Sequence, residues 1–156
     1  MTRYSDPLGL FGIEYPAGWR VRSSRAGTTA TTFFLDDAEE GIAVIVVPNG
    51  TVQGAFQAER LAPILLEQIR RTYPDFTFTA VSTRPLPGVG EQSQFSALWT
   101  NRWAQRMRGR GVIVSAPRGS QTVYSYVAGQ AQELAFPGVE PIIQRMLDSF
   151  QAALRG

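Results

Sequence analysis

The feature that most constrains the fold is a stripe of apolar residues near the end of the chain. Their spacing of i, i+3, i+4, i+7, i+8, i+11 and i+15 places them on one face of an α-helix. They are Val139, Ile142, Ile143, Met146, Leu147, Phe150 and Leu154. We expect a helix over residues 138–154, with Pro141 in its first turn, where proline costs no hydrogen bond. Because only one face is apolar, this helix needs a second element to cover it.

A second amphipathic helix is expected over residues 55–73. Leu61, Leu65, Ile69 and Tyr73 recur at every fourth position, which again makes one apolar stripe. Pro63 interrupts this pattern, and the sequence leaves two alternatives for it. The proline lies in the first turn of a shorter helix, or it kinks a longer helix that begins near residue 55.

The remaining segments have the alternating or β-branched character of strands. The predicted strands are residues 11–15, 19–23, 28–35, 42–47, 76–83, 92–100, 104–115 and 121–128. The run 42–47 is continuously apolar and is followed by Pro48-Asn49-Gly50, so we predict a central strand buried on both faces and ended by that turn. Strands and helices do not alternate strictly. This order predicts an α+β fold with a mostly antiparallel sheet of about six or more strands and two main helices.

The residue types present exclude several kinds of chemistry. The chain of 156 residues has no cysteine and no histidine, and its 15 basic residues are all arginine. A Ser-His-Asp triad, a Cys-His pair, an ordinary zinc site and a lysine Schiff base are therefore excluded. The acidic group Asp36, Asp37, Glu39 and Glu40 lacks the spacing of a calcium loop and is typical of a solvated turn. We expect no catalytic residue, no metal and no cofactor.

Charge is distributed unevenly along the chain. Residues 92–132 contain no acidic residue but five arginines, so this segment carries +5. The remaining ten arginines and 13 acidic residues give −3. The basic residues of the segment are Arg102, Arg106, Arg108, Arg110 and Arg118. Such a concentration of one sign indicates a candidate surface for an acidic or anionic partner.

The stretch WTNRWAQRMRGRG at residues 99–111 lies at the centre of this segment. Because side chains alternate across a strand, Arg106, Arg108 and Arg110 share one face. Two interpretations remain open: the solvated face of a strand, or a strip that recognises carboxylate or phosphate groups. Trp99 is expected in the core, and Trp103 is the candidate for an exposed anchor. Arginine–glycine alternation also occurs in RNA-binding segments, but no nucleic-acid motif accompanies it, and we do not expect a nucleic-acid partner.

Motifs from the two ends of the chain, taken together, resemble a known family. Near the start stands Gly12-Ile13-Glu14-Tyr15-Pro16-Ala17-Gly18-Trp19, and near the end come Val123-Tyr124-Ser125-Tyr126 and Met146-Leu147-Asp148-Ser149-Phe150. This arrangement resembles the PsbP-like superfamily. Its members include the photosystem subunit PsbP, the Ran-binding Mog proteins, DcrB-type lipoproteins and the effector-associated chaperones of type VI secretion.

The resemblance implies an α/β/α sandwich, a single domain over residues 1–156 with its core at 11–150, and a non-catalytic role in binding or assembly. The chain departs from several branches of the family. It has no lipoprotein cysteine and no histidine for the metal site proposed in some photosynthetic members. Type VI chaperones cradle apolar helices, and no exposed apolar groove is visible in the sequence.

Our first hypothesis is a non-enzymatic interaction module that binds an acidic protein or anionic surface. Its candidate binding residues are Arg102, Trp103, Arg106, Arg108, Arg110 and Arg118. The alternatives are a small-molecule-binding domain with a pocket between sheet and helix, and a regulatory or extracytoplasmic domain of a longer protein. No apolar run approaches the roughly 20 residues of a membrane span and no signal peptide is visible. We therefore expect no membrane partner, and a cytoplasmic protein if the N-terminus is native; the oligomeric state stays open.

Overall fold

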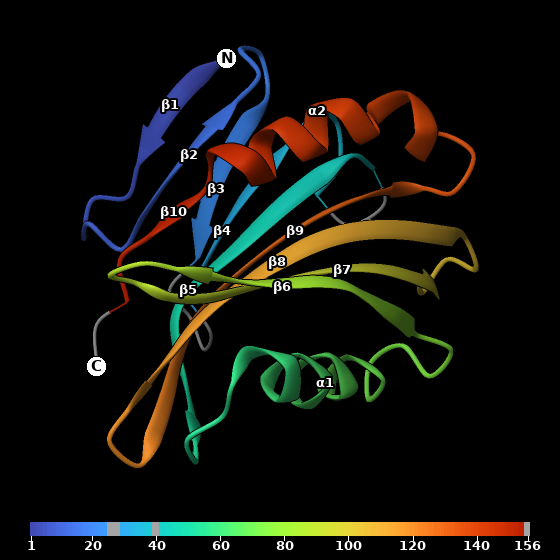
Figure 1. Cartoon of the computed structure of the whole chain (residues 1–156). Coiled ribbons are helices and arrows are strands. Elements are labelled where there is room, and N and C mark those ends of the chain that lie inside the picture. The colour runs from blue at the N-terminus through green and yellow to red at the C-terminus, as the bar shows by residue number, and fades with distance from the viewer. Residues whose placement is uncertain (25–28, 39–40, 155–156) are drawn as a thin grey trace.

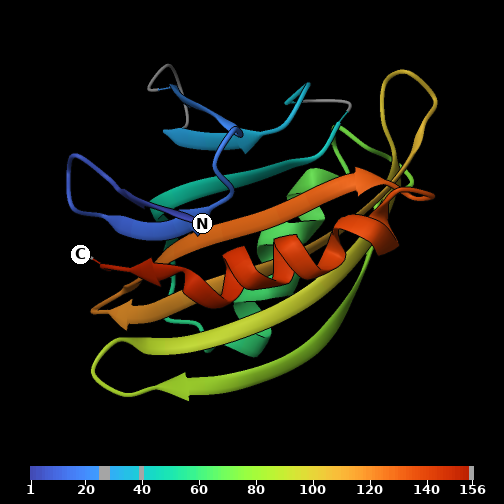
Figure 2. The same cartoon turned by 90° about the horizontal axis from the view of Figure 1, so that it is seen from above.

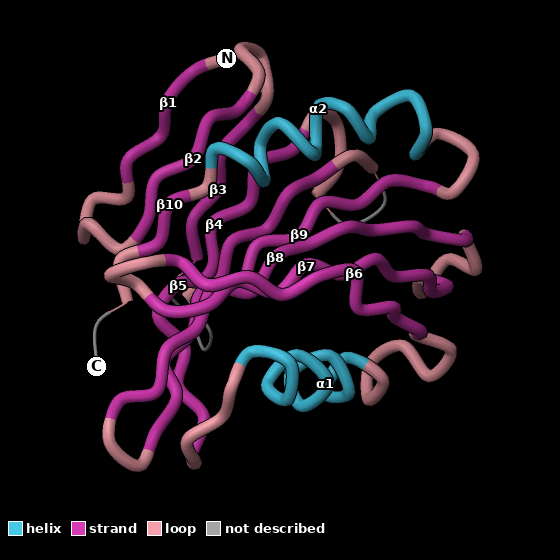
Figure 3. Tube along the Cα trace, viewed as in Figure 1, coloured by secondary structure: helices cyan, strands magenta, loops and turns pink. Residues whose placement is uncertain are grey.

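Two helices lie on opposite sides of a large twisted sheet (Figure 1). The computed structural model describes residues 1–24, 29–38 and 41–154. The parts of our predictions that fall on Thr28, Glu39 and Glu40 lie outside the described residues. Figure 3 colours the same trace by secondary structure and shows that strands make up most of the described chain. The α+β class and the two-helix sandwich expected from the sequence are therefore confirmed.

Among the described residues, seven antiparallel strands form the main sheet in the order β3-β4-β5-β9-β8-β7-β6, and three form a small sheet in the order β1-β2-β10. The strands are β1 (Thr2–Ser5), β2 (Phe11–Tyr15), β3 (Arg20–Ser24), β4 (Ala30–Phe34), β5 (Ala43–Gln53), β6 (Thr77–Leu86), β7 (Gly90–Thr100), β8 (Arg106–Arg118), β9 (Gln121–Gln132) and β10 (Gln151–Ala152). The helices are α1 (Ala58–Ile69) and α2 (Phe136–Ser149).

The centre of the main sheet is the expected meander of β7, β8 and β9. In β8, Arg110 lies opposite Ser96 of β7 and Gly129 of β9, so β8 is paired along both edges. Each of these strands is longer than predicted because the pairing continues to the hairpin turns. The predicted breaks lie near Asn101 and Gly119, where the chain turns between strands.

The core consists of two clusters, one on each face of the main sheet. On one face, α2 and the small sheet pack together over β5, β8 and β9, as the view in Figure 2 shows. Its buried members include Phe33, Val46, Val112, Val127, Ile143 and Met146. On the other face, α1 packs over β6, β7 and β8. That cluster includes Leu61, Leu66, Phe76, Phe95 and Ile113.

Both helices differ in their bounds from the prediction. α2 begins two residues earlier than expected, so Pro137 lies in the first turn and Pro141 lies inside the helix. Leu154 is not helical, because the backbone becomes extended at Phe150 and continues into β10, which pairs with β2. Pro63 also lies inside its helix, which begins at Ala58 and ends at Ile69, so the alternative that placed it in the first turn is wrong. Both prolines face solvent, and burial of the opposite apolar faces compensates for the missing hydrogen bond.

The prediction for the run 42–47 was wrong in two respects. β5 does not end at Pro48 but continues to Gln53 through a register shift between Val47 and Gly50. Only one of its faces is buried along the whole run: Val44 and Val46 are inaccessible, whereas on the other face Ala43 is buried but Ile45 is 37% exposed. A continuous β-branched run therefore reflects one core face and one face that opens onto a hollow, described below.

The packing of α2 predicts a sharp difference between two neighbouring isoleucines. Ile143 is fully buried, and Ile142 is 38% exposed. We expect Ile143→Ala to lower the free energy of unfolding by about 2–5 kcal/mol, because it leaves a cavity in the core. Ile142→Ala is the matched control and should cost less than about 1 kcal/mol. Urea unfolding followed by circular dichroism measures both, and equal losses would contradict the assigned face of α2.

Candidate functional site

Three of the predicted site residues lie together on the side of the sheet that carries α2. Arg106, Arg108 and Arg110 alternate along β8 with Met107 and Gly109, both of which are buried on the opposite side. We call these three arginines the arginine face. Their shared face, expected from the period of a strand, is confirmed.

The acid-free segment acquires acidic neighbours through the fold. Nη1 of Arg106 lies 3.1 Å from Asp75, and its Nε lies 3.8 Å from Glu133. Nη2 of Arg108 lies 4.0 Å from the same Glu133. Nη1 of Arg110 donates to Glu140 of α2 over 2.8 Å. Three carboxylates therefore face three guanidinium groups, and the charge that is concentrated in the sequence is balanced locally in the structure.

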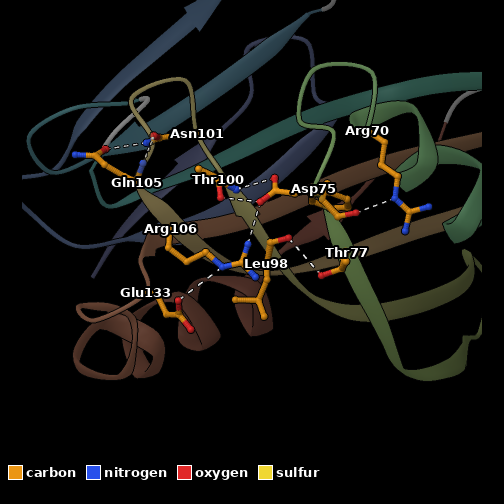
Figure 4. A network of polar contacts seen from close by, with 10 residues as sticks. Arg70, Asp75, Thr77, Leu98, Thr100, Asn101, Gln105, Arg106 and Glu133 are labelled. Carbon is orange, nitrogen blue, oxygen red and sulfur yellow. Dashed lines mark hydrogen bonds and ion pairs between the residues drawn. The ribbon is translucent and has the colours of Figure 1, made fainter.

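Asp75 is the most highly connected of these carboxylates (Figure 4). It accepts hydrogen bonds from the amide of Thr100 over 3.0 Å and from the hydroxyl of Thr100 over 2.6 Å. Thr100 lies opposite Arg106 across the β7–β8 ladder, so one carboxylate holds both members of this pair. The pKa of Asp75 is lowered by the hydroxyl and amide hydrogen bonds of Thr100 and, to a smaller extent, by the charge of Arg106.

Arg102 and Trp103 lie apart from the arginine face, in the loop between β7 and β8. Oδ1 of Asn101 accepts from the amides of Trp103 and Gln105, each over 3.0 Å, which fixes the loop. The guanidinium carbon of Arg102 lies 3.9 Å from the ring centre of Trp103. Trp103 is 45% exposed, so the expected exposure of this anchor is confirmed.

Arg118 is the sixth predicted site residue, and it lies at the far end of β8. Its Nη1 donates to the carbonyl of Pro117 over 3.0 Å. The six residues are thus distributed over three places: the arginine face, the β7–β8 loop and the β8–β9 turn. Within residues 1–24, 29–38 and 41–154, no group of three or more carboxylates could hold a metal ion, and neither helix is long and apolar enough to cross a membrane.

The opposite side of the sheet carries a hollow whose lining residues could not be identified from the sequence. It has a volume of about 470 Å³ and lies between the second half of α1 and strands β5, β7 and β9. We call it the groove; Ile45, Val47, Tyr73, Trp99, Tyr124 and Tyr126 line it. Trp99, expected in the core, is only partly buried because it forms part of this wall. No local pattern marks the groove, because its walls come from segments up to 85 residues apart in the chain, from Ile45 to Gln130.

No protein-family model and no curated protein sequence matches this chain, but solved structures do. LpqN of Mycobacterium tuberculosis, involved in cell envelope biogenesis, has a TM-score of 0.60 and 11% identity, covering 90% of this chain and 82% of LpqN. The cyanobacterial PsbP of Synechocystis has a TM-score of 0.55 and 13% identity, covering 97% and 92%. The Ran-binding protein Mog1p of Saccharomyces cerevisiae has a TM-score of 0.59 and 10% identity, covering 98% and 95%. At these identities the likeness concerns the fold alone, and for the fold it confirms the resemblance carried by the terminal motifs.

The contacts of Asp75 give a prediction for its titration. Thr100→Val removes the hydroxyl donor and should raise the pKa of Asp75, and Arg106→Gln should raise it less, because the charge of Arg106 is a smaller cause. Thr77→Val is the control, because the Thr77 hydroxyl bonds to the carbonyl of Leu98 instead. Carboxyl ¹³C NMR measures the three values.

The sign of the accompanying stability change follows from the lowered pKa. The ionised Asp75 stabilises the native state above the ordinary carboxyl pKa near 4, and this contribution is lost as pH falls through the lower native value. Acid unfolding of Thr100→Val should therefore begin at higher pH than that of Thr77→Val. An unchanged pKa of Asp75 in Thr100→Val would contradict the hydrogen-bond assignment.

Proposed function

Because the chain has the fold of PsbP and Mog1, we propose that it is a non-enzymatic protein-interaction module that binds an acidic segment of a partner protein through the arginine face. The absence of histidine, cysteine and lysine supports a binding role over a catalytic one. The yeast neighbour is itself a Ran-binding protein, which supports a protein partner without identifying one.

The observation that carries this proposal is the accessibility of the arginines together with one exposed leucine. Leu134 is 98% exposed and follows Glu133, whose amide donates to the carbonyl of Arg106 over 2.9 Å. A large apolar side chain beside exposed charged groups has the composition of an interface anchor with a polar rim. A hollow of about 320 Å³ beside Arg108 and Arg110 makes part of this surface concave.

The internal ion pairs do not prevent this role. The side chains of Arg106, Arg108 and Glu133 are each more than 40% exposed, and the two contacts with Glu133 are longer than a normal hydrogen bond. Exposed ion pairs of this kind contribute about 0–1 kcal/mol each, so exchange of Glu133 for a partner's carboxylate costs little. The internal carboxylates also lower the attraction of this surface for anions in general. This favours an acidic protein segment that fits the surface in shape as well as in charge over a polyanion that is attracted by charge alone.

The test uses a fluorescent peptide of alternating Glu and Leu residues, with a Lys-and-Leu peptide for comparison. Anisotropy should show that the acidic peptide binds, and more weakly as salt rises. Arg106→Gln with Arg108→Gln should weaken binding about tenfold, the equivalent of about 1.4 kcal/mol. Arg60→Gln with Arg71→Gln removes the same charge from exposed sites on and just after α1 and should change binding little.

The apolar part of the interface is tested separately. Leu134→Ser should weaken binding of the Glu-and-Leu peptide, whereas Leu8→Ser, a change at another exposed leucine, should leave this binding unchanged. If the Arg106/Arg108 and Arg60/Arg71 double variants lose the same amount of binding affinity, total charge governs binding. That result would contradict the arginine face as the binding site. Equal binding of the Lys-and-Leu peptide would contradict an acidic partner.

A further inference from the structure

The groove is a second, separate feature of the molecule, on the other side of the sheet from the arginine face. α1 packs directly on β6, β7 and β8, and a hollow remains between its second half and the β5 and β9 strands. Its position, between sheet and helix, is the one that the small-molecule alternative required. Its volume of about 470 Å³ lies within the ordinary range of small-ligand pockets, roughly 300–1,000 Å³.

The wall of the groove is preformed by packed aromatic rings. The centre of the Trp99 ring lies 5.8 Å from that of Phe76 and 6.4 Å from that of Tyr73. The rings of Phe95 and Tyr126 stack with their centres 5.9 Å apart. These contacts hold the rings in place before any ligand arrives, so binding would cost little side-chain entropy.

Two glycines of β8 make room for this wall. A Cβ at Gly109 would lie 2.9 Å from the Trp99 ring, and a Cβ at Gly111 would overlap the Phe95 ring. Without side chains at these positions, both rings can lie directly against the strand. The glycines of the Arg-Met-Arg-Gly-Arg-Gly run therefore have a packing role on the groove side.

Three phenol groups give the groove polar chemistry. None of the hydrogen bonds among the described residues involves the hydroxyls of Tyr73, Tyr124 or Tyr126, although all three side chains line the groove. Burial raises the pKa of the Tyr124 and Tyr126 phenols, so both remain protonated and retain a hydrogen to donate. The groove thus combines an apolar floor with hydrogen-bond donors.

One end of the groove is basic. A second hollow, of about 570 Å³, shares Ile45, Tyr73 and Ala128 with the first, so the two hollows adjoin each other at these residues. Arg22, Arg102 and Trp103 line this second hollow. Among the described residues that line either hollow, none is acidic. A guanidinium matches a carboxylate in planar, two-point hydrogen bonding.

We propose that the groove binds a long-chain aliphatic carboxylate, with its chain over Ile45 and Val47 and its carboxylate at the end formed by Arg22 and Arg102. The apolar floor fits an alkyl chain, and the basic end fits its single negative charge. Two adjoining hollows of this size suit one narrow chain better than a folded partner. Arg110 borders the groove as well, but its guanidinium pairs with Glu140 on the α2 side, so the ligand proposed for the arginine face and the one proposed for the groove bind on opposite sides of β8.

The probe is dodecanoate, below its micelle concentration, measured by isothermal titration calorimetry on the whole chain. It should bind saturably, and dodecanol, which has the same chain without the charge, should bind more weakly. The double variant Arg22→Gln with Arg102→Gln should weaken the binding of dodecanoate about tenfold and leave the binding of dodecanol unchanged. The double variant Arg60→Gln with Arg145→Gln is the charge-matched control and should leave the binding of both compounds unchanged.

A blocking variant tests the position of the alkyl chain. Ile45→Trp fills the floor at a partly exposed position, so the fold should persist, as an unchanged urea midpoint would show, while binding of both compounds is lost. No saturable binding by the wild type, or equal binding of dodecanoate to Ile45→Trp, would overturn the proposal. Displacement of dodecanoate by the Glu-and-Leu peptide would also overturn it, in favour of a peptide site; a peptide that binds without displacing dodecanoate supports it.

Discussion

The alternation of side chains along β8 is the constraint on which both surfaces of this molecule depend. β8 is paired along both edges, so its side chains can project only toward α2 or toward α1. On one side its first half carries the arginine face, and on the other it carries Met107, Gly109 and Gly111. A shift of register by one residue would bury the arginines and remove the space for Trp99 and Phe95. The pairing of one strand therefore determines the polar face and the groove together.

The sequence predicted what depends on periodicity. The common face of Arg106, Arg108 and Arg110, the meander and the two one-sided helices all follow from local spacing. The exposure of Trp103 follows instead from its place at the junction between two predicted strands. The terminal motifs added the fold, because they are short signatures of how the first strands and the last helix are placed. The ends of the helices were less predictable, since packing allowed Pro63 and Pro141 inside them.

What the sequence missed depends on contacts between distant segments. Asp75 lies 25 residues from Thr100 and 31 from Arg106, and Glu140 lies 30 from Arg110. A charge count along residues 92–132 could not include these carboxylates, so it overstated the positive charge of the surface. The run 42–47 was misread for the same reason: a β-branched strand gives the same pattern whether its second face meets a helix or a hollow.

The glycines of β8 illustrate both what local spacing predicts and what only contacts between distant segments reveal. Next to arginine, glycine is typical of RNA-binding segments, and that interpretation treats the two residue types as one motif. In the structure they face opposite sides of the sheet and serve different purposes: the arginines meet carboxylates, and the glycines admit aromatic rings. A composition pattern within a strand therefore combines two unrelated signals. Separating the odd from the even positions before assigning a function is the physically justified way to interpret it.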